Sequence, residues 1–594
     1  MDNSVASDAL LDRSKLSTEA ALVLCCATTA ATPARTALAS ETAASIISWD
    51  RVADIAKHHA ILPLVYRYLK AECPGAVPEA SMAKLRTEWQ LNELTCDMQV
   101  LRNLQPTLRK GEWKVTVAVH GGSRIIGVWP GYYERALGLA VDVGSTTIAG
   151  HLCDLESGEV VASSGAMNPQ IRFGEDLMSR VSYSMMHPGG AQQMTEAVHE
   201  ALNTLAADVA RQAKVSPQDI LVMTLVGNPI MHHLLLGIDP VELGGAPFAL
   251  ATDEAVNLNA SEIGLNLHPN ARIYVLPCIA GHVGADAAGM LLAERPDLGD
   301  ELTLLVDVGT NAEIVLGNRQ RLLACSSPTG PAFEGAQISC GQRAAPGAIE
   351  RVRIDPNTLE PRFKVIGSDL WSDEPGFAEA TSKIGVTGVC GSGIIEVIAE
   401  MFLAGVINQD GVVDGQLASR SDRIVPTGRT FSYVVHRGEM TLMVTQNDVR
   451  AIQLAKAALY AGVKLLMDHL GVDHVDRIRL AGAFGSHIDV KYAMLLGMIP
   501  DCDLGQVASA GNAAGTGARI ALLDNGSRAT IEELVRKVEK IETAIEPRFQ
   551  EHFVEAMGIP HSTATYVHLR KAVTLPEPKA AAPRAGSRGS RRRA

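Results

Sequence analysis

The feature that most constrains this chain is a segment that occurs twice. The two copies read LAVDVGSTTIAG at residues 139–150 and LLVDVGTNAEIVL at residues 304–316. In each copy an apolar run leads to an acid, a glycine turn with polar residues and a second apolar run. Asp142 and Asp307 take the same place in the two copies, 165 residues apart. Two copies of one strand–turn–strand unit at a domain-sized spacing predict two domains of the same fold.

The turns of the two copies are suited to holding phosphate. A glycine after a strand lets the chain turn without a Cβ, and the freed N–H groups and hydroxyls then point at phosphate oxygens. The phosphate-binding candidates are Gly144, Ser145, Thr146, Thr147, Gly309, Thr310 and Asn311. Asp142 and Asp307, at the strand ends, are the candidate catalytic residues and Mg²⁺ ligands, since Mg²⁺ prefers carboxylate oxygens.

A third glycine turn, LAGAFGS at residues 480–486, follows a strand-like run at residues 475–480. A single acid–x–glycine segment is more often only a tight turn. Two matching copies with a third glycine turn in order favour a nucleotide site.

The order of the three turns resembles the phosphate-1, phosphate-2 and adenosine motifs of the acetate and sugar kinase, chaperone and actin ATPase (ASKHA) superfamily. This resemblance implies an α/β fold with two RNase H-like domains of the actin and sugar kinase type around a nucleotide cleft. It also implies that Gly482 and Gly485, in the third turn, let an adenosine approach the backbone. A narrower resemblance, over about residues 106–570, is to the reductive activators of corrinoid proteins. The segments that carry it are MNPQIRFGED (167–176), VGNPIMHH (226–233), SPTGPAFEGA (327–336), TGVCGSG (387–393) and TQNDVR (445–450).

The resemblance implies an activity. Members of that family are understood to return an oxidised Co(II) corrinoid protein of a methyltransferase system to Co(I), with ATP hydrolysis coupled to the uphill electron transfer. The implied cofactors are ATP and Mg²⁺, and the implied partner is a corrinoid protein. In the family the electron comes from an iron–sulfur cluster in an N-terminal ferredoxin-like domain.

The N-terminal region departs from that pattern. The ten cysteines include no C-x-x-C and no C-x₄-C-x₂-C spacing, so we expect no iron–sulfur cluster in this chain and an external low-potential electron donor. The region reads as helical. Val52, Ile55 and Ala56 share one helix face, and a second stripe over residues 83–104 contains Leu91, Leu94, Met98 and Leu101. Residues 45–104 faintly resemble the leading helices of a nucleotidyltransferase-like family.

We divide the chain into five parts. They are a helical N-terminal region (1–105), the start of a small strand-rich linker domain (106–136) with a hairpin turn at Gly121-Gly122, a first ATPase domain (137–300), a second ATPase domain (301–570) and a disordered basic tail (571–594).

Charge and hydropathy restrict the partners. The net charge is −13 although six Lys and Arg residues lie in the final 16, so the body of the chain is acidic and we expect no nucleic-acid partner. No apolar run approaches the length of a membrane span, and the N-terminus lacks the positive charge of a signal peptide, so we expect a cytoplasmic protein without a membrane partner. A homodimer is one option for the oligomeric state.

Several single residues have two interpretations each. For His282 and Asp286, a phosphate-facing role and a structural turn remain equally open. A core role is favoured for His232-His233 and for Cys390, and a solvated helix face rather than a nucleotide contact for Lys456. The glycine-rich segments 327–335 and 387–393 are candidates for an exposed docking surface.

Two other functions stay open beside corrinoid activation. One is a small-molecule kinase of the same superfamily, which needs a base beside an acceptor hydroxyl. The other is a nucleotide-dependent module that remodels a partner without redox chemistry. ATP turnover that depends on a Co(II) corrinoid protein would separate the three.

Overall fold

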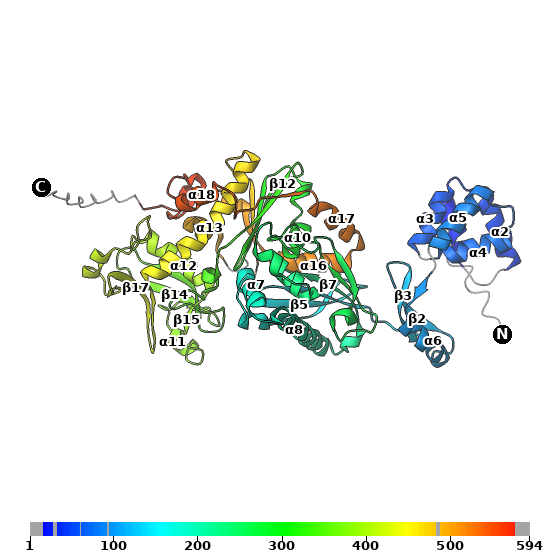
Figure 1. The fold of residues 1–594 in the computed structure, drawn as a ribbon, viewed down its shortest axis with the longest axis horizontal. Coiled ribbons are helices and arrows are strands. Elements are labelled where there is room, and N and C mark those ends of the chain that lie inside the picture. The colour runs from blue at the N-terminus through cyan, green and yellow to red at the C-terminus, as the bar shows by residue number, and fades with distance from the viewer. Residues whose placement is uncertain (1–15, 28–31, 60, 92–93, 483–487, 577–594) are drawn as a thin grey trace. The chain divides into compact units, whose positions relative to one another are not determined.

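The computed structural model describes residues 16–27, 32–59, 61–91, 94–482 and 488–576 (Figure 1). The chain forms two compact units, residues 1–135 and 136–594, and each is described by itself. In the described ranges, no helix combines the length and the apolar character that crossing a membrane requires.

The first unit begins with five helices that share one hydrophobic core. Val52 and Ala56 are fully buried in it, as the sequence pattern predicts. A hairpin follows, and its turn contains Gly121 and Gly122, both at positive φ. The elements are α1 (Thr18–Cys26), α2 (Pro33–Ala44), α3 (Trp49–His58), α4 (Leu62–Glu72), α5 (Glu79–Leu91), β1 (Thr95–Cys96), α6 (Met98–Lys110), β2 (Val115–His120) and β3 (Arg124–Pro130).

The single helical stripe predicted over residues 83–104 is wrong. α5 and α6 are separate helices, and β1 lies between them. β1 pairs with β3 in parallel, so its backbone hydrogen bonds go to the hairpin and not to a helix. Leu94, Met98 and Leu101 are exposed as a result.

The first sheet of the second unit has the order β6-β5-β4-β7-β9-β8. β4, β5 and β6 are antiparallel neighbours, β4, β7 and β9 are parallel, and β8 runs antiparallel to β9. The strands are β4 (Leu137–Val143), β5 (Thr147–Asp154), β6 (Val160–Met167), β7 (Ile220–Val226), β8 (Val256–Asn259) and β9 (Arg272–Val275).

In the second sheet, of order β20-β19-β10-β11-β12-β21, the first five strands repeat the pairing of β9-β7-β4-β5-β6, and the sixth strand, β21, runs parallel to β12. The strands are β10 (Thr303–Val308), β11 (Ala312–Gly317), β12 (Leu322–Ser327), β19 (Arg477–Ala481), β20 (Val507–Gly511) and β21 (Val538–Lys540). In both sheets the strand that carries the repeated acid lies between its hairpin partner and a parallel strand, with Asp142 opposite Val226 and Asp307 opposite Ala481. The predicted pair of α/β domains of one RNase H-like type is confirmed.

A large insertion separates β12 from β19. It holds two small three-stranded sheets and two long helices. Its elements are β13 (Ala348–Ile354), β14 (Pro361–Val365), α11 (Phe377–Ala380), β15 (Gly388–Val389), α12 (Gly391–Leu403), β16 (Ile424–Thr427), β17 (Thr430–Arg437), β18 (Thr441–Val444) and α13 (Gln446–Leu470). The remaining helices of this half are α15 (Val490–Leu496), α16 (Ala513–Leu523), α17 (Asn525–Val535), α18 (Phe549–Glu555) and α19 (Val567–Ala572).

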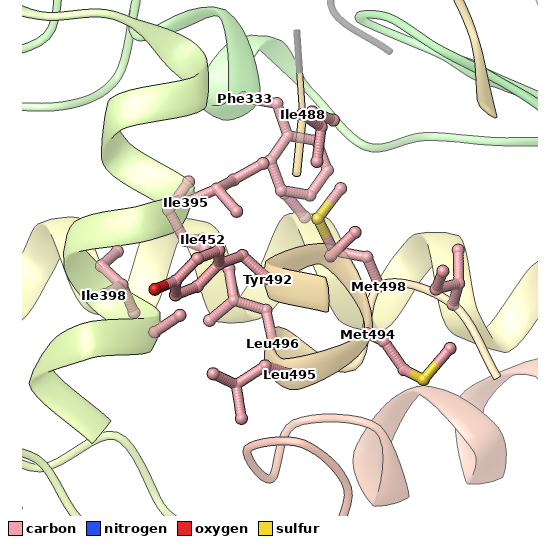
Figure 2. Packing of buried hydrophobic residues seen from close by; sticks show 14 of the residues in the cluster. Phe333, Ile395, Ile398, Ile452, Ile488, Tyr492, Met494, Leu495, Leu496 and Met498 are labelled. Carbon is pink, nitrogen blue, oxygen red and sulfur yellow. The ribbon is translucent and has the colours of Figure 1, made fainter. Parts of the chain in front are cut away.

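The central strands of each sheet are buried on both faces, which explains why β4 and β10 read as continuous apolar runs. Alternate residues of β10 pack against the core around α12, α13 and α15, and Figure 2 shows part of this core. Alternate residues of β4 pack against α7 (Leu177–Met186), α8 (Gly190–Ala213) and α9 (Pro229–Leu236).

The opposite faces of the two sheets share a third core, formed around α10 (Ala285–Glu294), α16 and α17. α10 and α16 approach closely at two glycines, since a Cβ on Gly517 would lie 2.0 Å from the carbonyl oxygen of Gly289. Thr224 on β7 also donates to the Ala518 carbonyl oxygen of α16 at 2.7 Å. A helix from late in the chain therefore covers the first sheet, on the side opposite α8 (Figure 1).

Candidate functional site

The two repeated hairpins are tight turns closed by their own backbone. The Gly144 N–H donates to the Thr147 carbonyl oxygen at 3.0 Å, and the Gly309 N–H donates to the Asn311 carbonyl oxygen at 3.2 Å. A Cβ on Gly144 would lie 2.6 Å from that Thr147 oxygen, so the first turn requires glycine.

The hydroxyl groups of the turns bind side chains from elsewhere in the fold. Ser145 Oγ accepts a hydrogen bond from Asn228 Nδ2 at 2.7 Å. Thr146 and Thr310, one from each hairpin, both donate to Glu334, at 3.4 Å and 2.9 Å. The structure therefore brings the two predicted phosphate turns together on one carboxylate.

Four acidic side chains gather at the base of the hairpins. Removal of water by the surrounding protein raises the pKa of Asp142 to about 6. Desolvation, with the charge of Asp142, raises the pKa of Asp286 to about 7. Desolvation and the charges of Asp286 and Asp142 raise the pKa of Asp307 to about 8. Glu313, paired with Asp307 across β10 and β11, has its pKa raised well above the usual value by burial and by Asp286 and Asp307.

The protein compensates these acids in part, through hydrogen bonds; the Ala287 N–H donates to Asp286 Oδ1 at 2.8 Å. Asn512, the N-cap of α16, donates to Asp142 Oδ2 at 2.8 Å and partly offsets the effect of desolvation. Within the described ranges, none of the four acids forms an ion pair with a lysine, arginine or histidine. A divalent cation bound at this cluster would neutralise the negative charge of its carboxylates.

The donor set fits Mg²⁺ better than a metal that needs a complete protein cage. No group of three or more His, Cys, Asp or Glu side chains in the part of the chain that the structure describes is arranged to hold a metal ion. Mg²⁺ keeps several waters and is usually bound by one or two carboxylates together with substrate phosphates. Asp142 and Asp307 are half-buried, so both remain accessible to such an ion.

The third glycine turn lies against the second acid. Gly482, after β19, has φ +89°, and a Cβ there would lie 2.4 Å from Asp307 Oδ1. Gly485, the other predicted adenosine contact, lies outside the described residues. The third glycine turn therefore lies next to the acid of the second hairpin, although about 175 residues separate them in the sequence.

A cavity of about 190 Å³ opens beside the hairpins. Thr146, Thr310 and Glu334 line it, together with Glu175 and Arg343. It lies where the two hairpins approach each other, so a phosphate chain and water molecules have room next to the predicted phosphate-binding residues.

Sequence reasoning missed four residues of this site as functional candidates, namely Asn228, Glu313, Glu334 and Asn512. Asn512 reaches the site only through the fold, and no local pattern marks it. Asn228 lies in the segment 226–233 and Glu313 in the second copy of the repeat, but neither was singled out there. Glu334 falls within the segment 327–335, which we expected to form an exposed docking surface. That expectation is wrong, because Thr329, Ala332 and Phe333 are at most 5% exposed.

The second docking candidate, 387–393, is also buried. Gly391, Ser392 and Gly393 begin α12 inside the core. Cys390 is buried as expected, and its thiol lies 3.2 Å from the Ile349 carbonyl oxygen.

The structure also decides between the interpretations of the remaining single residues. His232 and His233 are buried in α9, as expected for a core role. Asp286 joins the acid cluster, whereas His282 lies 3.2 Å from Glu542. Both interpretations of Lys456 are wrong, since it is 1% exposed and donates to the carbonyl oxygens of Gly558 and Pro560.

Comparisons with known proteins match most of the chain. The family model of the C-terminal domain of RACo, the ASKHA domain, matches residues 301–570. That of the RACo middle region matches 137–297, and that of the RACo linker region matches 81–135. The linker match thus begins earlier than the linker that we expect from residue 106.

Two curated relatives and one solved structure are similar over most of their lengths. The corrinoid activation enzyme RamQ of Eubacterium limosum is 32% identical over 474 residues, 77% of this chain and 77% of that protein. A Co(II) methylated amine-specific corrinoid protein reductase of Methanosarcina barkeri is 25% identical over 427 residues, 69% of this chain and 72% of that protein. The structure of a reductive activator for corrinoid, iron-sulfur protein has a TM-score of 0.72 at 32% identity, covering 84% of this chain and 78% of that one.

Proposed function

Because this chain belongs to the family of RACo-type reductive activators of corrinoid proteins, we propose that it is an ATP-dependent enzyme that returns a Co(II) corrinoid protein to Co(I). The resemblance that the motifs indicate is thereby confirmed. The corrinoid protein of a methyltransferase system is the substrate partner.

The observation that carries the ATPase part of this proposal is the meeting of the two hairpins. Glu334 accepts hydrogen bonds from Thr146 and Thr310, so the turns of the two repeated domains lie close enough to act on one ligand. Turns of this kind present N–H and hydroxyl donors, which suit a polyphosphate.

We assign the residues as follows. Asp142 and Asp307 hold Mg²⁺, directly or through water, and Asp286 adds negative charge to the same site. Mg²⁺, when bound, neutralises charge on the phosphate oxygens. The phosphate-binding residues are Gly144, Ser145, Thr146, Thr147, Gly309, Thr310 and Asn311, and Gly482 and Gly485 lie beside the adenosine.

We propose that the electron comes from an external low-potential donor. All ten cysteines lie among the described residues and are free thiols, and eight of them are buried. No set of them is grouped for metal binding in the described ranges. One electron per cobalt converts Co(II) to Co(I), and ATP hydrolysis supplies the free energy for the uphill transfer.

The shared core supports a coupling route between the nucleotide and the partner. α10 carries Asp286, and Asn512 caps α16, so both helices begin at the acid cluster and cross at Gly289 and Gly517. A change of charge at that cluster acts on both helices, and through them on the relative position of the two sheets.

The test supplies the purified protein, a Co(II) corrinoid protein, an external low-potential reductant and ATP under anaerobic conditions. We expect the absorption of Co(I) to appear with ATP and Mg²⁺ and to be absent with ADP or a non-hydrolysable ATP analogue. Co(I) formation at the same rate without ATP would contradict the coupling. ATP-dependent phosphorylation of a small metabolite would favour the kinase alternative, and ATP-dependent partner release without reduction would favour the remodelling alternative.

A further inference from the structure

Glu334 is the carboxylate that reaches both hairpins. Its Oε1 accepts from Thr310 Oγ1 at 2.9 Å, and its Oε2 accepts from Thr146 Oγ1 at 3.4 Å. Within the described part of the chain, Glu334 forms no ion pair. Its negative charge is therefore held by neutral hydroxyl groups alone, and these are the hydroxyls assigned to phosphate.

The position of this carboxylate is fixed by the fold. Glu334 ends a short 3₁₀ helix, η7 (Pro331–Glu334). The preceding residue, Phe333, is fully buried and packs with Ile395 and Ile488 in the core (Figure 2). Thr329 Oγ1 donates to the Gly309 and Thr310 carbonyl oxygens at 2.7 Å and 3.0 Å, which ties this segment to the second hairpin.

The carboxylate also borders open space. Glu334 is half-buried and lines the cavity of about 190 Å³ beside Thr146 and Thr310. A cavity of this size has room for water beside the carboxylate. An ionised carboxylate only accepts hydrogen bonds, so it binds a water through that water's own protons.

On the basis of the proposed function, we propose that Glu334 is the catalytic carboxylate that orients the attacking water in ATP hydrolysis. With ATP bound, Thr146 and Thr310 turn their hydroxyl groups to phosphate oxygens, and the oxygens of Glu334 are left for water. Asp142, Asp286 and Asp307 form a separate cluster committed to the cation.

In the step that follows, the water oxygen forms a bond to the γ-phosphorus. The bond between that phosphorus and the β–γ bridging oxygen breaks, and its electron pair leaves with ADP. One proton of the water passes to Glu334 and then to solvent, and inorganic phosphate is released.

The test compares Glu334→Gln with the parent protein. The variant keeps the size of the side chain and removes its charge. We expect affinity for a non-hydrolysable ATP analogue with Mg²⁺ to stay within about threefold and ATP hydrolysis to fall about a hundredfold or more. After incubation with ATP and separation from free nucleotide, the variant should carry ATP, whereas the parent should carry ADP.

Two further variants serve as controls. Glu175→Gln removes the same charge from the wall of the same cavity, so it measures the electrostatic effect alone. A loss of hydrolysis equal to that of Glu334→Gln would refute a specific role for Glu334. Glu334→Asp keeps the charge but shortens the side chain, so the carboxylate lies further from the two hydroxyl groups. We expect this variant to lose part of its ATP hydrolysis. It replaces Glu334→Gln in the test if the glutamine variant fails to fold.

The outcomes separate this inference from the proposed function. Hydrolysis by Glu334→Gln within threefold of the parent refutes the inference. If the same variant also binds nucleotide more tightly, Glu334 only links the two hairpins through Thr146 and Thr310, and ATP displaces it from these hydroxyl groups. A parent protein that hydrolyses ATP but never yields Co(I) refutes the proposed function and leaves the role of Glu334 standing. A parent that does not bind ATP refutes both.

Discussion

Replacing Gly482 by alanine tests whether the third glycine turn controls Asp307. Gly482 has φ +89°, and the added Cβ would lie 2.4 Å from Asp307 Oδ1 and 3.0 Å from the Val308 carbonyl oxygen. Real Cβ atoms do not approach oxygen this closely, so the carboxylate must move away. The substitution therefore acts on the proposed magnesium ligand without changing its chemistry.

Two effects determine how strongly Gly482→Ala should lower the stability of the fold and the affinity for nucleotide. An L side chain in the left-handed region costs about 1–2 kcal/mol of folding free energy. Turning Asp307 off its preferred rotamer costs about 0.5–1.5 kcal/mol more. Binding of Mg²⁺ requires the carboxylate to return against the new methyl group, so the same strain should weaken Mg²⁺-dependent nucleotide affinity by about two- to tenfold.

Gly471→Ala is the matched control. Gly471 caps α13 at φ +72°, and a Cβ there meets nothing within 4 Å. Both variants should lower the unfolding midpoint, but only Gly482→Ala should weaken binding of a fluorescent ATP analogue, and its loss should be larger with Mg²⁺ than in EDTA, where only the contact with adenosine is affected. Equal affinities for the two variants with Mg²⁺, or a loss of the same size with Mg²⁺ and in EDTA, would refute the placement of Asp307 as a magnesium ligand.

Four further predictions follow from other parts of the structure. Asp142→Asn and Asp307→Asn should each keep the fold and lower ATP hydrolysis about a hundredfold, because each removes charge from the proposed magnesium site. The rate of ATP hydrolysis is measured as phosphate release. If both variants hydrolyse ATP at the parental rate, the hairpins are structural turns and do not bind phosphate. Burial lowers the pKa of His232 to about 4, so the unfolded chain binds more protons than the folded one between about pH 4 and 6.5, and stability is lost as the pH falls through that range. His232→Leu should remove on the order of 2–3 kcal/mol of the fall in unfolding free energy over this pH range. Urea midpoints that fall with pH as steeply as those of the parent would contradict this. Lys456→Met leaves the buried carbonyl oxygens of Gly558 and Pro560 without their donor, at a cost of about 1–3 kcal/mol, and hydrogen exchange around them should accelerate. Anaerobically purified protein should contain no stoichiometric iron by elemental analysis, whereas stoichiometric iron with visible absorbance would mean that scattered thiols converge on a cluster.

The hairpins were predictable because everything that defines them is local. An apolar run, an acid and a glycine turn occur within a dozen residues at each of the two copies, and repetition indicated two like domains. The residues that complete the site were not predictable in this way. Asn512 contacts Asp142 across 370 positions of sequence, and Glu334 reaches Thr146 across 188. Only the packing of one domain against the other creates these contacts.

The helical stripe near residue 98 failed for a related reason. Apolar spacing between Leu94 and Leu101 satisfies the helical period, but a strand elsewhere in the sequence competes for the backbone hydrogen bonds of residues 95–97. Periodicity contains no information about such a competitor. The same limit applies to Lys456, whose partners lie about a hundred residues further along the chain.

The late helix that covers the first sheet has a consequence for biosynthesis. β7 is complete at residue 226, but α16 ends at residue 523. At 5–20 residues per second, a ribosome needs roughly 15–60 s to make the intervening chain. Until residue 523 has been made, the second face of the nascent first sheet lacks α16, and the apolar residues of that face are available to chaperones or to aggregation. A fragment that stops near residue 300 would keep this exposed face permanently, so expression of the first ATPase domain requires residues 513–523 as well.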